Sequence, residues 1–127
     1  MARDLGVYRF EDIVEGPTGS WHVRDGAEDL FDRPLGSESA VRVFWSEPAT
    51  ALGLPLIASV YEYGFYHGVR WSGDQFRAVA AEVDRLEAYW IAAGLPPDTL
   101  ADLRARAALV RQAVSAAEAC GGWVVIT

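Results

Sequence analysis

The chain has 127 residues, of which 51% are hydrophobic and 23% are charged, the composition of one ordinary globular domain. It carries 18 acidic and 11 basic residues, for a net charge of −7. Nucleic acids and anionic membranes are bound through basic surfaces, so this balance argues against both as partners. No apolar run reaches the roughly 18 residues of a membrane span, and the first residues lack the apolar stretch of a signal peptide. We therefore expect a cytoplasmic protein.

Residues in the first half of the chain have the β-branched and alternating patterns of strands. Residues 7–14 and 20–24 predict a hairpin, because Gly16-Pro17-Thr18-Gly19 interrupts them. Residues 25–39 contain glycine, proline and four acids, and we expect an irregular loop. Three apolar side chains can anchor this loop: Leu30, Phe31 and Leu35.

Further strands are predicted in the middle of the chain. Residues 40–45 and 56–63 are β-prone, and residues 48–55 are expected to connect them. Residues 65–71 are expected to return beside the second of these strands. The turn between them is assigned either to Gly64 or to the His67-Gly68 pair.

Two helices are predicted in the second half. Ser72 and Gln75 have the spacing of a capping box, and Trp71 and Phe76 have the spacing of a hydrophobic staple. Apolar residues then recur every three or four positions, which predicts one helix at 73–93 and a second at 97–119. The short loop between the two helices makes them antiparallel neighbours. Residues 123–126 are continuously apolar and predict a strand inside the sheet.

These segments together predict one α+β domain. Its antiparallel sheet combines the N-terminal strands with the C-terminal strand, and the two-helix hairpin covers one face. We expect Trp71, Trp90 and Trp123 to lie in the core. The aromatic residues expected to be exposed are Trp21, Tyr61, Tyr63 and Tyr66.

Residues suited to catalysis or metal binding are few. Cys120 is the single cysteine, which excludes an internal disulfide and any zinc site built on several thiolates. The sequence contains no G-x-S-x-G, no G-x-G-x-x-G and no P-loop lysine. A metal site would have to combine His22 and His67 with acids of residues 25–32, and no spacing fixes such a geometry. We therefore predict no cofactor and no metal.

Residues 61–71 gather the most chemically active side chains: five aromatics, an acid, a histidine and an arginine in eleven positions. Glu62, His67 and Arg70 could converge there on a ligand, with Tyr66 beside them. In a strand, however, neighbouring side chains point to opposite faces, and the tyrosines would form the cross-strand pairs of an ordinary hairpin. Three interpretations stay open: a structural hairpin, a protein-binding surface and a small-molecule pocket.

Acidic residues are concentrated near the N-terminus. Residues 1–47 carry ten acids and five arginines, whereas residues 72–127 carry seven acids and five arginines. Tryptophan, tyrosine and arginine dominate the energetics of protein interfaces, and surrounding acids steer a basic partner toward them. We therefore predict a non-enzymatic domain that binds a basic protein partner. The predicted interface residues are Trp21, Asp25, Glu28, Asp29, Asp32, Tyr61, Glu62, Tyr63, Tyr66 and His67.

Two other functions stay open. The first is a small enzyme or ligand-binding domain with a site around Glu62, Tyr66, His67 and Arg70. The second is a homodimer that hides the tyrosine face. In composition the chain resembles the immunity proteins that neutralise bacterial toxins, because it is a small acidic domain without catalytic motifs. That resemblance implies inhibition by binding.

Overall fold

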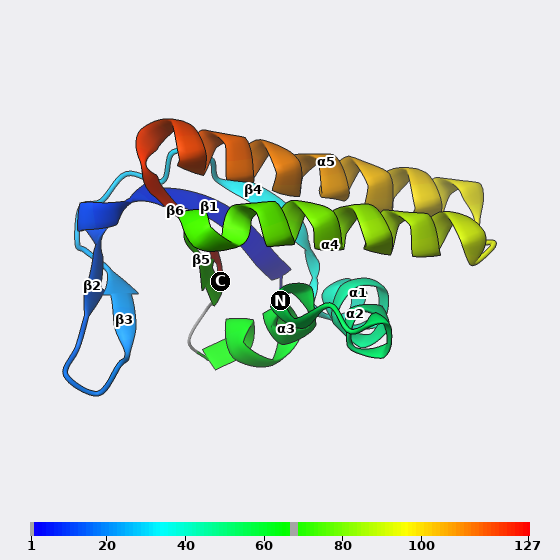
Figure 1. Ribbon diagram of the computed structural model, residues 1–127, viewed down its shortest axis with the longest axis horizontal. Helices are drawn as coiled ribbons and strands as arrows, with labels where there is room; N and C mark the ends of the chain where they lie inside the picture. Colours follow the sequence, from blue (N-terminus) through cyan, green and yellow to red (C-terminus); the bar gives the residue numbers. More distant parts are fainter. Residues whose placement is uncertain (1, 67–68) are drawn as a thin grey trace.

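A four-stranded antiparallel sheet lies at the centre of the protein. The computed structural model describes residues 2–66 and 69–127, without the side chains of residues 62–66. The strand order is β4-β1-β6-β5, and every neighbouring pair is antiparallel (Figure 1). The strands are β1 (Ala2–Arg9), β4 (Arg33–Ser37), β5 (Val69–Trp71) and β6 (Gly122–Ile126). The predicted sheet of N-terminal strands and a C-terminal strand is confirmed, and β6 lies inside it as expected.

The register divides the side chains of this sheet between two faces. Leu5 pairs with Ile126 and Val7 pairs with Val124, and these four side chains are fully buried on one face, the core face. Because side chains alternate along a strand, the residues between them point to the other face. This second face, called the outer face below, carries Gly6, Tyr8, Arg70, Trp123 and Val125.

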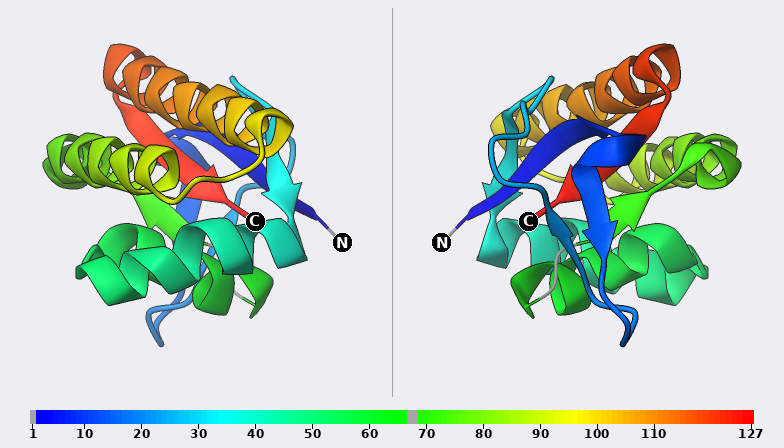
Figure 2. Two further views of the ribbon diagram at one scale, coloured as in Figure 1. Left: turned by 90° about the vertical axis from the view of Figure 1, so that its right-hand side faces the viewer. Right: turned by 90° about the vertical axis from the view of Figure 1, so that its left-hand side faces the viewer.

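Two long helices cover the core face. Helix α4 spans Gly73–Ala92 and helix α5 spans Pro97–Cys120, which confirms both predicted helices within one residue at each end. The N–H of Ser72 donates to Oε1 of Gln75 at 3.0 Å, as the capping box requires. Trp71 and Phe76 are both buried beside this cap. Figure 2 shows α4 and α5 side by side over one face of the sheet.

A small hairpin follows β1. After the 3-10 turn η1 (Phe10–Asp12), strand β2 (Ile13–Glu15) pairs with β3 (Trp21–Val23) in a separate two-stranded sheet. The predicted hairpin is therefore present but shorter, because residues 7–9 belong to β1. The right-hand view of Figure 2 shows the hairpin and the loop after it on the side turned to the viewer.

Residues 38–66 are helical except for Gly53 and Leu54, so the strands predicted at 40–45 and 56–63 are wrong, and the connection predicted at 48–55 is reduced to these two residues. The segment contains α1 (Glu38–Ala40), the π-helix η2 (Val41–Ser46), α2 (Glu47–Leu52) and α3 (Pro55–Tyr66). Val41, Trp45 and Ala49 are four residues apart and all buried, which is helical spacing. The turn expected at Gly64 is wrong because Gly64 lies within α3. The alternative turn, His67-Gly68, falls outside the described residues.

The π-helix η2 is joined to its neighbours by polar contacts. Ser46 is buried, and its Oγ donates to the carbonyl of Ile57 at 3.3 Å and accepts from the N–H of Tyr61 at 3.0 Å. The Ser46 hydroxyl thus contacts both the carbonyl and the N–H group that stand four residues apart as one hydrogen-bonding pair of the α3 backbone. The Trp90 indole donates to the carbonyl of Phe44 at 2.7 Å. The irregular helix is therefore fixed to both α3 and α4.

A single hydrophobic cluster connects the sheet, α4, α5 and the helices of residues 38–66. Trp71 and Trp90 lie in it as predicted, and Trp45 joins them. The expectation for Trp123 is wrong: this residue is only half-buried, because its position in β6 points to the outer face. In the part of the chain that the structure describes, no helix has the length and apolarity needed to cross a membrane.

Candidate binding surface

Arg70 lies on the outer face of the edge strand β5 and contacts residues of three other strands. Its guanidinium lies over the Trp123 ring at 4.8 Å and over the Trp21 ring at 5.3 Å, measured to the ring centroids. Its Nη2 also forms an ion pair with Glu15 of β2. Strand β5 places Arg70 on the outer face because Val69 and Trp71 point into the core. Arg70 therefore attaches the β2–β3 hairpin to the main sheet.

An aromatic row continues beyond Arg70. The Phe10 ring meets the Trp123 ring edge to face, with 5.1 Å between centroids and 80° between planes. Nη1 of Arg70 and Nε1 of Trp123 are buried without a hydrogen-bond acceptor among the described residues. Ring stacking, rather than hydrogen bonding, thus holds these two side chains together.

Asp29 shapes the loop beside this row. Its Oδ1 accepts from the backbone N–H groups of Val7, Phe31 and Asp32 at 3.0–3.1 Å. Gly6 makes room for it, since a Cβ at that position would lie 2.8 Å from Oδ2 of Asp29.

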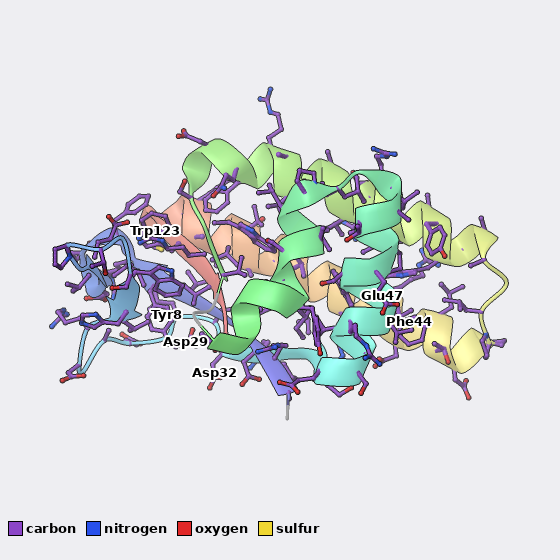
Figure 3. The ribbon with its side chains drawn as sticks, turned by 90° about the horizontal axis from the view of Figure 1, so that it is seen from below. Tyr8, Asp29, Asp32, Phe44, Glu47 and Trp123 are labelled. Atoms are coloured by element: carbon purple, nitrogen blue, oxygen red, sulfur yellow. The ribbon has the colours of Figure 1, made fainter. Side chains whose placement is uncertain are left out.

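Burial raises the pKa of the Tyr8 hydroxyl above 10.0, and the carboxylates of Asp29 and Asp32 raise it further. Figure 3 shows Trp123, Tyr8, Asp29 and Asp32 on this side of the molecule.

Residues 10–32, called the acidic front below, carry seven acids and one arginine. Three of the acids have structural partners: Asp12 is buried against Arg24 at 2.6 Å, Glu15 pairs with Arg70, and Asp29 binds backbone amides. The other four are exposed and make no ion pair with any described residue: Glu11, Asp25, Glu28 and Asp32. The side chains of Phe10 and Val14 are also exposed there, by 46% and 38%. The acidic front therefore combines negative charge with apolar surface.

The predicted interface residues are only partly brought together. Asp25, Glu28 and Asp32 are exposed on the acidic front, whereas Trp21 is half-buried under Arg70. Tyr61 packs against the core, and Arg3 lies over its ring at 5.9 Å. The Asp29 carboxylate is occupied by backbone N–H groups. The other predicted residues fall outside the described side chains: Glu62, Tyr63, Tyr66 and His67. Of the alternative site around Glu62, Tyr66, His67 and Arg70, only Arg70 can be placed.

Sequence reasoning missed the stacking of Trp21 and Trp123 on Arg70. One indication was present, because alternation in Val69-Arg70-Trp71 sends the arginine away from its two apolar neighbours. In the structure, Glu15 and Trp21 are paired across the hairpin, so both reach Arg70 from the same end of it. Nothing in the sequence, however, indicates that this hairpin packs on the outer face.

Comparison of the chain with protein-family models, with curated proteins and with solved structures gave no significant match. Within the described residues, no group of three or more histidine, cysteine or acidic side chains has a geometry that could hold a metal ion. Function is therefore inferred from the acidic front and the row of aromatic side chains beside it.

Replacing Arg70 with glutamine should loosen the hairpin. The substitution removes two cation–π contacts and an ion pair, which together contribute about 1.5–2 kcal/mol to the packing of the hairpin on the sheet. We expect amide hydrogens in β2 and β3 to exchange roughly 10–30-fold faster, as measured by hydrogen–deuterium exchange. Amides of β6 should keep their protection. Arg9→Gln is the matched control, since Arg9 is exposed at the end of β1, and equal effects of both variants would contradict the assigned role.

Proposed function

We propose that the chain is a non-enzymatic domain that binds a basic protein partner through the acidic front. Four exposed acids without ion pairs among the described residues support this proposal, because their charge is available to a partner. Such charge speeds the diffusional encounter with a basic protein and orients it. Inhibition of a toxin, as by an immunity protein, is the form of this function that we favour.

The row formed by Phe10, Trp123, Arg70 and Trp21 supplies the apolar part of the proposed interface. Trp and Arg are enriched among the residues that dominate binding energy, and Phe10 is exposed at one end of the row. Loop and hairpin backbones beside the row are held by Asp29 and by the Asp12–Arg24 pair. A partner would therefore meet a surface that is largely organised before binding, which reduces the entropy cost of association.

The proposal can be tested with two variants of equal net charge. The front variant carries Glu11→Gln, Asp25→Asn, Glu28→Gln and Asp32→Asn. The control variant neutralises four exposed acids elsewhere that make no ion pair within the described part of the chain: Asp4, Asp74, Asp98 and Glu118. A partner is first captured from an extract of the source cells on the immobilised wild-type domain and identified by mass spectrometry. Its association rate with all three proteins is then measured by surface plasmon resonance.

We expect the front variant to associate about ten-fold more slowly than wild type at 50 mM salt, because steering depends on local charge. The control variant should stay within about two-fold, and the difference should shrink at 500 mM salt as screening increases. Failure of the wild-type domain to retain any partner would overturn the proposal. Equal slowing of both variants would show that net charge, rather than the acidic front, governs association.

A further inference from the structure

A groove of about 620 Å³ lies between α4 and α5, near the start of α4 and the end of α5. Phe76 and Val114 form its buried apolar floor, and the exposed Phe10 ring lies beside it. The groove exists because the helices present small side chains to it, including Ala80 and Ser115. Its volume is within the range of ordinary small-molecule sites.

The charges along the groove are unevenly neutralised. Arg111 lies 2.7 Å from Asp84 and 3.0 Å from Glu87, so two carboxylates already surround it. Arg77 also lines the groove, is exposed, and forms no ion pair with any residue that the structure describes. Glu118 lines the groove from α5. Arg77 on α4 is therefore the cation that remains available to a ligand.

We propose that the groove binds a small aromatic carboxylate, with the ring between Phe10 and the apolar floor and the carboxylate near Arg77. A ring suits this position because Phe10 and Phe76 offer aromatic surface for offset or edge contacts. A carboxylate on the ligand suits the groove because Arg77 lacks a counter-ion among the described residues, although the net charge of the whole chain is −7. This proposal does not rest on the proposed protein partner, although Phe10 belongs to both surfaces.

Three probes that share one apolar part separate the contributions: 4-phenylbutyrate, 4-phenylbutanol and 4-phenylbutylamine. The field of an acidic protein favours the amine, so a preference for the carboxylate has to come from the local site. We expect 4-phenylbutyrate to bind about three-fold or more tightly than either other probe in NMR titrations that follow backbone amides of α4 and α5. Equal affinity for the three probes, or no shifts at the groove, would overturn the proposal.

Substitutions assign the binding to the groove. Arg77→Gln should weaken 4-phenylbutyrate binding by about two- to five-fold, the usual contribution of an exposed ion pair, and leave 4-phenylbutanol unchanged. Arg85→Gln on the same helix is its control. Glu118→Gln should strengthen 4-phenylbutyrate binding by removing a repulsive carboxylate.

A tryptophan at Ser115, which is exposed and lines the groove, should abolish binding of all three probes by filling the space. Gln112→Trp adds the same side chain at an exposed position of α5 outside the lining and should leave binding intact. If Ser115→Trp binds 4-phenylbutyrate as well as Gln112→Trp does, the ligand site is not this groove. Circular dichroism of both variants is the check that they are folded.

Discussion

Replacing Trp90 with alanine should lower the free energy of unfolding by about 3–5 kcal/mol, the usual cost of truncating a large buried aromatic side chain. Trp90 is 1% exposed and meets the ring of Trp45 edge to face, with 5.0 Å between centroids. Its indole N–H also donates to the carbonyl of Phe44 in the π-helix. The substitution therefore leaves a cavity, and it leaves the partly buried carbonyl of Phe44 without its hydrogen-bond donor.

Urea unfolding followed by circular dichroism measures this effect. Trp90→Phe keeps most of the volume but loses the indole donor, so we expect a smaller loss of about 2 kcal/mol. Tyr89→Ala is the neighbouring control, because the Tyr89 side chain is 43% exposed, and its cost should stay near 0.5 kcal/mol. A loss for Trp90→Ala no larger than that of Tyr89→Ala would mean that α4 is not packed against η2 as described.

Helices α4 and α5 could be predicted because their local and periodic patterns agree. The capping box, the hydrophobic staple and apolar residues at helical spacing all indicate the same start and the same buried face for α4. For α5, Leu103, Ala107, Val110 and Val114 are buried as their spacing predicts. Such patterns depend on residues close in sequence, so a single sequence is sufficient to detect them.

The strands predicted within residues 38–66 are wrong because the β-propensity of this segment conflicts with its helical spacing of buried apolar residues. The stretch Ala40-Val41-Arg42-Val43-Phe44-Trp45 is rich in strand-forming residues, yet packing against α3 and against Trp90 of α4 favours the helix. Helix-start features were present: Oγ of Ser37 accepts from the N–H of Ala40 at 3.1 Å. Pro48 and Pro55 both lie in first turns of helices, where proline is tolerated.

The candidate binding surface is predictable from the sequence in its charge but not in its geometry. The acids of residues 10–32 are visible in the sequence, and five of the seven are exposed, four of them without an ion pair to any described residue. Whether an acid is free or occupied depends on distant contacts, such as Asp29 with the N–H of Val7 and Glu15 with Arg70. These contacts join residues 22 and 55 positions apart, so local patterns carry no information about them.

Glu82 is a second case in which only the tertiary structure reveals the role of an acid. It lies in α4 between Ala81 and Val83 and is 7% exposed. Its Oε1 accepts from the N–H of Ile57 at 2.9 Å, and its Oε2 accepts from the N–H of Leu56 at 3.3 Å. The carboxylate thus satisfies free amides in the first turn of α3, where the helix dipole also favours a negative charge.

Glu82→Ala should therefore destabilise the fold by about 3 kcal/mol, because it leaves the two amides of α3 without their acceptor in a buried environment. Glu82→Gln retains one acceptor oxygen but loses the charge, and we expect about 1–1.5 kcal/mol. Glu118→Ala removes an exposed acid of α5 and should cost no more than about 0.5 kcal/mol in the same urea experiment. Amide exchange at Leu56 and Ile57 should accelerate in Glu82→Ala beyond the global change. If it does not, the carboxylate is not the group that holds the start of α3 against α4.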